Sequence, residues 1–122
     1  MAIEFTTTVE DDTLVVKACG FDERLEQVQQ YGMDIIQACL QQQVSRVLCD
    51  ECDLEYRLST FDTYAAAEFI AENAPLIAKV AIVCNPAFIK DALFWETVAV
   101  NRGLTIQVFK DIDAARRWLK PA

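Results

Sequence analysis

The chain has 122 residues, of which 53% are hydrophobic, so it is long enough to bury a core as one domain and too apolar to stay disordered. It has 19 acidic against 11 scattered basic residues and a net charge of −8, which argues against nucleic acid or an anionic membrane surface as partner. Histidine is absent, which excludes Ser-His-Asp and Cys-His hydrolases and zinc sites that need imidazole.

The first half of the chain is predicted to form a hairpin, a helix and a buried strand. Segments 3–9 and 13–19 are rich in β-branched residues and flank an acidic turn, which is typical of two paired strands. Over 22–43 the apolar residues recur at helical spacing. Residues 46–50 (RVLCD) are typical of a short buried strand, and 51–58 are expected to form a loop.

The second half alternates helices with strands. A helix is predicted over 61–73 and a buried strand over 79–84 (KVAIVC), followed by a helix over 85–102 that begins at an Asn-Pro pair. A last strand over 104–109 and a last helix over 112–119, with an aspartate as its N-cap, complete the chain.

The order β-β-α-β-α-β-α-β-α predicts one α/β domain spanning 1–122, with a mixed, mostly parallel five-stranded sheet and about four helices. Right-handed crossovers make the four later strands parallel, and the first strand is then antiparallel at or near an edge. Ligands of such sheets bind outside the carboxyl ends of the strands. We therefore expect a site near the loops that follow Cys19, Asp50, Cys84 and Phe109.

Four segments carry a resemblance to a known family. They are the strand ending at Asp50, the hydroxyls of Ser59 and Thr60 at a helix start, the strand 79–84, and the closing VFKDIDAARRWL at 108–119. With this element order the chain resembles the STAS domains (sulphate transporter and anti-sigma-factor antagonist), and most of all the small stand-alone SpoIIAA-like proteins of the STAS/SEC14 type. The resemblance implies a non-catalytic regulatory domain that contacts proteins, and its SEC14 side implies a lipid or small apolar ligand.

Ser59 and Thr60 are candidate phosphoacceptors on this resemblance, because STAS anti-anti-sigma factors are phosphorylated on a serine at that helix start. Their D-S-S-G-like turn is replaced here by EYRLSTFD. A phosphate would be stabilised there by the free N–H groups and the positive end of the helix dipole. The alternative is that Ser59 only caps the helix, in an S-x-x-D pattern with Asp62, which contributes about 1 kcal/mol.

Asp50, Arg57, Asn85 and Glu96 form a candidate ligand or partner site. Glu96 falls within an apolar arc of its predicted helix, so it needs a basic partner such as Arg57, a pocket, or a route to water. The acidic residues around Asp50 could perform acid–base chemistry, but their spacing matches no known ligand loop. We therefore predict no catalytic residue and no enzyme activity.

Phe94 and Val98 are an i, i+4 pair on the other side of the same helix and are predicted to face outward or toward a neighbour. They are the candidate interface for a partner or a homodimer. The alternative is an ordinary pair of scattered surface residues.

Cysteines follow several of the predicted strands, namely Cys19, Cys49, Cys52 and Cys84. They could converge to bind zinc or to form a redox pair, or they could be small buried apolar residues. Since the chain has a single C-x-x-C knuckle, we predict no metal and no cofactor.

The location and the partner complete the expectations. No apolar run approaches the ~20 residues of a membrane span, and the first residues lack the features of a signal peptide, which favours a cytoplasmic protein. The predicted function is regulation through a protein partner or a second copy of the chain, and the alternative is binding of a small apolar ligand.

Overall fold

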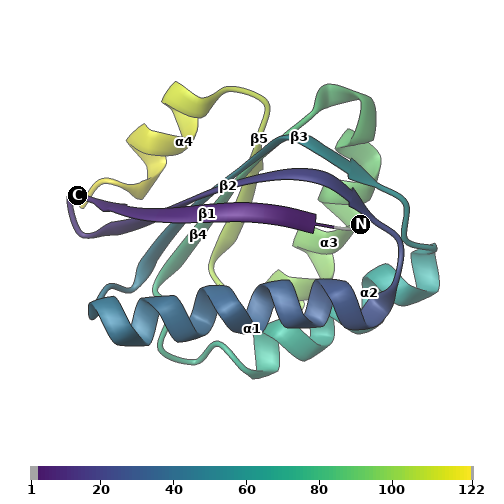
Figure 1. Ribbon diagram of the computed structural model, residues 1–122, viewed down its shortest axis with the longest axis horizontal. Helices are drawn as coiled ribbons and strands as arrows, with labels where there is room; N and C mark the ends of the chain where they lie inside the picture. The colour runs from purple at the N-terminus through teal and green to yellow at the C-terminus, as the bar shows by residue number, and fades with distance from the viewer. Residues whose placement is uncertain (1–2, 122) are drawn as a thin grey trace.

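One sheet of five strands forms the centre of the molecule, and the strands lie in chain order. The computed structural model describes residues 3–121 (Figure 1). The strands are β1 (Ile3–Glu10), β2 (Thr13–Asp22), β3 (Arg46–Tyr56), β4 (Lys79–Cys84) and β5 (Ile106–Phe109). β1 is antiparallel to β2 and lies at one edge, whereas β2 to β5 run parallel to one another. The predicted mixed, mostly parallel sheet is confirmed.

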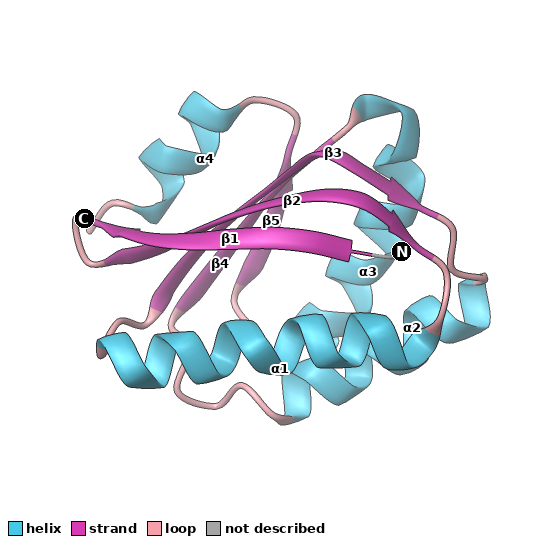
Figure 2. Ribbon diagram, viewed as in Figure 1, coloured by secondary structure: helices cyan, strands magenta, loops and turns pink. Residues whose placement is uncertain are grey.

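The helices cover the two faces of the sheet unequally (Figure 2). They are α1 (Leu25–Gln42), α2 (Thr60–Glu72), α3 (Ile89–Asn101) and α4 (Ile112–Leu119), with a short 3-10 turn at Pro86–Phe88 before α3. Helices α1, α2 and α3 pack on one face, and α4 packs alone on the other. We call these the three-helix face and the α4 face.

The sheet extends further than the sequence predicted. The segment 51–58 was expected to be a loop, but β3 continues through Tyr56 and pairs there with Asp22 at the end of β2. Pairing of β3 with β4 stops at Glu51, so this second half of β3 has a neighbour on one side only. The loop prediction was wrong because the acidic residues of this segment are poor strand formers, and pairing with β2 overrides that preference.

A bulge interrupts β3 at the point where its pairing changes. The four residues from Asp50 to Asp53 lie opposite the three from Lys17 to Cys19. Asp50 stabilises the bulge, because its Oδ1 accepts the N–H of Cys52 at 3.3 Å. Such extra residues bend a strand and redirect the side chains beside it.

Two hydrophobic clusters fill the two faces. Val47 belongs to the large cluster under α1, α2 and α3, and its neighbour Leu48 belongs to the small cluster under α4, as strand alternation requires. The small cluster consists of Leu48, Ala81, Val83, Ala115 and Leu119. Most of the core, and every buried charged residue within 3–121, lies on the three-helix face.

Candidate functional site

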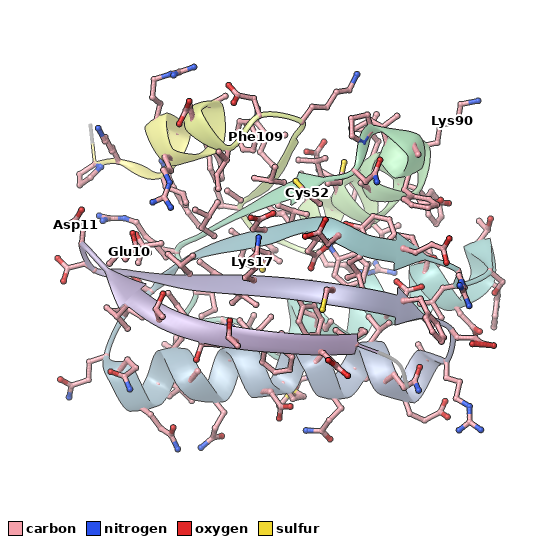
Figure 3. The ribbon with its side chains drawn as sticks, turned by 45° about the horizontal axis from the view of Figure 1, so that its top comes forward. Glu10, Asp11, Lys17, Cys52, Lys90 and Phe109 are labelled. Carbon is pink, nitrogen blue, oxygen red and sulfur yellow. The ribbon has the colours of Figure 1, made fainter. Side chains whose placement is uncertain are left out.

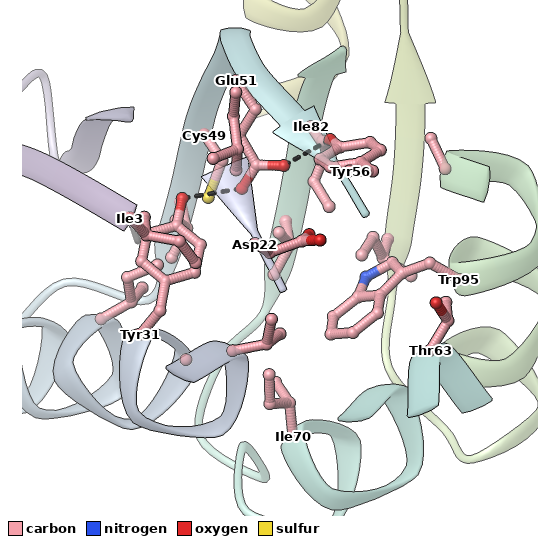
Figure 4. Close-up of a pocket in the computed structure, with 18 of the residues that line it drawn as sticks. Ile3, Asp22, Tyr31, Cys49, Glu51, Tyr56, Thr63, Ile70, Ile82 and Trp95 are labelled. Carbon is pink, nitrogen blue, oxygen red and sulfur yellow. Dashed lines mark hydrogen bonds between the residues drawn. The ribbon is translucent and has the colours of Figure 1, made fainter. Parts of the chain in front are cut away.

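A cavity of about 110 Å³ lies between the sheet and helices α1, α2 and α3 (Figure 4). Its walls are mainly aliphatic side chains, such as those of Ile35, Leu54, Ile70 and Ile82. A few polar groups also reach it, namely those of Asp22, Tyr31, Glu51, Tyr56, Thr63, Asp91 and Trp95. Apolar walls with a small number of placed polar groups are typical of small-molecule sites.

Glu51 is buried in the wall of this cavity, with both carboxylate oxygens occupied. Its Oε2 accepts the hydroxyl of Tyr31 at 2.7 Å and its Oε1 accepts the hydroxyl of Tyr56 at 2.5 Å (Figure 4). Burial raises the pKa of Glu51, and the two tyrosine hydroxyls oppose that rise. Burial and the neighbouring carboxylate also raise the pKa of both tyrosines, so both hydroxyls stay protonated and donate hydrogen bonds to Glu51. Each carboxylate oxygen of Glu51 therefore accepts one tyrosine hydroxyl, and the two hydrogen bonds fix the orientation of the side chain.

Asp22 is the second buried carboxylate and closes the end of β2. Its Oδ1 accepts two backbone N–H groups, from Arg57 at 2.6 Å and from Leu58 at 3.0 Å. Burial raises the pKa of Asp22, while these two hydrogen bonds oppose the rise. The contact fixes the short connection between β3 and α2 and so positions Ser59, which begins that helix.

Trp95, on α3, brings an unpaired donor to the cavity. Within residues 3–121, its indole Nε1 is the one buried side-chain nitrogen or oxygen that lacks a hydrogen-bond partner. Figure 4 shows this nitrogen on the side of the ring that faces the pocket, toward Asp22. A buried donor without a partner is uncommon in folded proteins and needs an explanation.

Neither Glu51, Asp22 nor Trp95 was identified as a site residue from sequence. Glu51 was placed in a loop and Asp22 at a helix start. The one available signal was alternation, because Cys49 and Glu51 are two residues apart and therefore point to the same face of a strand.

The predicted group of Asp50, Arg57, Asn85 and Glu96 is not brought together, since no hydrogen bond or ion pair in residues 3–121 joins any two of them. Asp50 lies on the α4 face and pairs with Lys17 at 3.3 Å (Figure 3 shows Lys17 and Cys52 on this side). Burial alone would raise the pKa of Asp50, but hydrogen bonds from Cys52 and Lys17 outweigh it and lower that pKa.

The other three members have separate structural contacts. The exposed guanidinium of Arg57 stacks on the ring of Phe21 at 3.9 Å. Asn85 caps the 3-10 turn by accepting the N–H of Ala87 at 2.9 Å. Glu96 accepts the N–H of Val108 on β5 at 2.6 Å, so its partner is backbone and none of the basic residues considered for it.

Ser59 caps α2 as the S-x-x-D pattern predicted. Its Oγ accepts the N–H of Asp62 at 3.1 Å. Ser59 and Thr60 are both exposed, and the next side chain, Phe61, is 80% exposed. The start of α2 therefore presents two hydroxyls beside a large apolar surface.

The prediction that Phe94 and Val98 face outward was wrong. Val98 is only 7% exposed and Phe94 is half-buried. The reason is that α2 packs against α3 and covers the side of the helix that was expected to be free. The exposed apolar residues of α3 are instead Leu93 and Val100.

The four cysteines do not form one cluster. Cys49 is buried under the three helices, whereas Cys52 is exposed. Partial loss of water around the Cys52 thiol raises its pKa to about 11, with further increases from Asp50, so the thiol stays protonated at neutral pH. Residues 3–121 contain no group of three or more Cys, Asp or Glu side chains placed to hold a metal ion.

Comparisons with known proteins found similarity in structure but none in sequence families. No family model matches the sequence, and the search of curated proteins found no match. The structure is similar to a crystal structure of an anti-sigma factor antagonist from Mycobacterium paratuberculosis, with a TM-score of 0.68 and 12% identity over 98% of this chain and 96% of that one. It is also similar to an uncharacterised protein with a SpoIIAA-like fold from Shewanella loihica, with a TM-score of 0.59 and 17% identity over 98% of this chain and 94% of the other.

These similarities confirm the predicted STAS-like, SpoIIAA-like α/β fold. At such identities they concern the fold and leave the function to the residues. As for the membrane, none of the helices within residues 3–121 has the length and apolar character needed to cross one.

Proposed function

We propose that this chain is a non-catalytic regulatory domain that acts by binding a protein partner through the start of α2. We define the α2 surface as Ser59, Thr60, Phe61 and Tyr64. The observation that carries the proposal is the exposure of Phe61, a large apolar side chain that contributes nothing to the core and would bury its ring only in a contact. The fold shared with an anti-sigma factor antagonist is consistent with this role.

The α2 surface is held in place by contacts from neighbouring elements. Asp22 fixes the backbone that leads into Ser59. Arg102, just after α3, donates to the hydroxyl of Tyr64 at 2.6 Å and also pairs with Glu68. A preformed surface loses little conformational entropy on binding, which favours recognition.

The partner is tested by comparing Phe61→Ser with Leu76→Ser, a matched change at a residue that is 70% exposed outside the α2 surface. Each protein is immobilised and exposed to lysate of the native host, and retained proteins are identified by mass spectrometry. We expect one protein to bind the wild type and Leu76→Ser and to be lost with Phe61→Ser. Equal retention by all three, or retention of nothing, would contradict the proposal.

Phosphorylation of Ser59 or Thr60 is part of the same proposal. Both hydroxyls lie at the positive end of α2 and are accessible. Intact-mass measurement of protein recovered from its native host should show an added phosphate that disappears in the double variant Ser59→Ala, Thr60→Ala. A phosphate that persists in this variant would place the modification elsewhere.

Self-association and location follow as parts of the proposal. A second copy of the chain is the alternative protein partner, and light scattering of the wild type and of Phe61→Ser would distinguish a dimer built on the α2 surface from a monomer. All five cysteines are free thiols, which fits a reducing compartment such as the cytoplasm.

A second candidate function is the binding of a small apolar molecule in the cavity between the sheet and α1, α2 and α3. The volume of about 110 Å³ and the apolar walls favour it. Native mass spectrometry of the purified protein, before and after extraction with organic solvent, would detect a retained ligand, and titration with small cyclic molecules would detect binding to the empty protein.

A further inference from the structure

Building on this second candidate function, we infer that the cavity selects a small, mainly apolar molecule that carries no negative charge and has one hydrogen-bond acceptor, which receives the indole N–H of Trp95. Three features of the cavity carry the inference: its volume, the charges around it, and its unpaired donor. Each of them narrows the chemistry of the ligand independently.

The volume sets the size of the ligand. An engineered apolar cavity of ~150 Å³ in another protein binds benzene. The cavity here is about 110 Å³, with walls such as Ile35, Ile70 and Ile82. A single ring, or a branched chain of similar bulk, matches this space, whereas a complete phospholipid or a long fatty acyl chain far exceeds it.

The charges around the cavity exclude anions. Its described lining includes Asp22, Glu51 and Asp91 and contains no lysine or arginine. A ligand carboxylate or phosphate would enter an apolar space beside three acidic side chains, with no cation to offset its loss of water. The ligand therefore carries no negative charge.

The unpaired donor requires an acceptor on the ligand. Among the other polar side chains, Tyr31 and Tyr56 donate to Glu51, the Oδ1 of Asp22 accepts two backbone N–H groups, and Thr63 donates to the carbonyl of Ser59. Trp95 Nε1 alone lacks a partner among the buried side-chain nitrogens and oxygens of residues 3–121. Buried waters typically make about three hydrogen bonds, whereas a ligand carbonyl or ether oxygen needs only this one donor.

Three probes of similar size test the inference, namely cyclohexanone, methylcyclohexane and cyclohexanecarboxylate. They are titrated into the ¹⁵N-labelled full chain, and the indole N–H signals of its two tryptophans are followed by NMR. Trp95→Phe assigns the Trp95 signal and removes the donor while keeping an aromatic ring. Trp118→Phe is the matched control, because Trp118 packs with Phe109 on the α4 face.

We expect cyclohexanone to shift the Trp95 indole signal and to bind more tightly than methylcyclohexane, with cyclohexanecarboxylate not binding. Trp95→Phe should weaken cyclohexanone binding by about two- to tenfold, the range of one net hydrogen bond, and leave methylcyclohexane binding unchanged. Trp118→Phe should bind all three probes as the wild type does.

The possible failures are distinguishable. If cyclohexanone and methylcyclohexane bind equally well and Trp95→Phe changes neither, the acceptor inference is overturned while the second candidate function stands. Binding of cyclohexanecarboxylate would overturn the selection against anions in the same way. If no probe binds and no ligand is retained in native mass spectrometry, the candidate function falls and this inference falls with it.

Discussion

The two faces of the sheet differ in what they bury. The α4 face has a small cluster without charged residues, centred on Leu48 and Leu119, and Lys79 closes it by donating to the carbonyl of Trp118 at 2.9 Å. The three-helix face buries most of the core but leaves a cavity, and it holds Asp22 and Glu51 beneath the helices.

The contrast suggests a division of roles: the α4 face contributes stability, and the three-helix face contributes a binding site. Filled, apolar packing is what a face needs for stability alone. A void with paired carboxylates and an unpaired donor lowers stability, so its presence on one face favours a binding role there. The following predictions test the contrast, beginning with the largest expected effect.

Removing a leucine from each face should cost different amounts of stability. Leu48→Ala and Leu54→Ala should both lower the free energy of unfolding, within about 2–5 kcal/mol. Leu48 should be nearer the upper end, because it is enclosed in the α4 face, whereas Leu54 borders the cavity and has fewer contacts to lose. Urea denaturation measures both. A larger loss for Leu54→Ala would mean that the cavity is closed in solution.

Removing a tyrosine hydroxyl that donates to the buried carboxylate of Glu51 should cause the next largest loss of stability. Tyr31→Phe leaves Glu51 with one donor fewer in a buried site and should cost about 1.5–3 kcal/mol, the range for hydrogen bonds to charged groups. Tyr64→Phe is the control, because Tyr64 is exposed at the surface. Equal losses in the two variants, measured by urea denaturation, would show that the Glu51 contact adds nothing specific.

Acidification should stabilise the protein through the three-helix face. Burial raises the pKa of Glu51 and of Asp22 in the folded state above their ordinary values of 4.5 and 3.8. The ionised forms are therefore penalised in the folded state above the folded pKa, and the penalty disappears as pH falls through it toward the unfolded values. Each unit of raised pKa corresponds to about 1.4 kcal/mol.

The variant Glu51→Gln cannot ionise, so it should lose the Glu51 part of this dependence. Free energies of unfolding measured at intervals from pH 7 to about pH 4.5 should rise less steeply on acidification for Glu51→Gln than for the wild type. Parallel pH profiles for the two proteins would mean that the carboxyl of Glu51 titrates in its ordinary range.

The smallest effect is expected on the open part of the α4 face. Lys17 pairs with Asp50 at 3.3 Å, but its side chain is 64% exposed. Exposed ion pairs contribute little, so Lys17→Met should leave the free energy of unfolding unchanged within error in urea denaturation. A loss of stability comparable with that of Tyr31→Phe would show that the ion pair between Lys17 and Asp50 contributes substantially to the free energy of unfolding.

Local signals in the sequence were sufficient for much of the fold. The strand 79–84 has the bounds that its uninterrupted apolar run predicted. Two predicted helix caps were also correct, since Ser59 accepts from Asp62 and Asp111 accepts from Asp113 and Ala114, as their spacing indicated. Such features depend on residues within one turn of each other, which a single sequence displays directly.

The candidate site depends on contacts that are distant in sequence. Glu51 and Tyr31 are 20 residues apart, and the cavity exists only where three helices meet the sheet. The burial of Val98 likewise depends on how α2 lies on α3. The second half of β3 is acidic and follows a bulge, so neither composition nor period revealed it as a strand.

The carboxylate of Glu96 has a consequence for assembly. β5 is an outer strand, and Glu96 takes a backbone donor that an incoming strand from another copy would need. β1 forms the opposite border of the sheet with its outer side unoccupied within residues 3–121. Glu96 thus hinders strand-to-strand joining of copies at β5, and joining through β1 alone would end at a two-fold pair instead of growing into a filament.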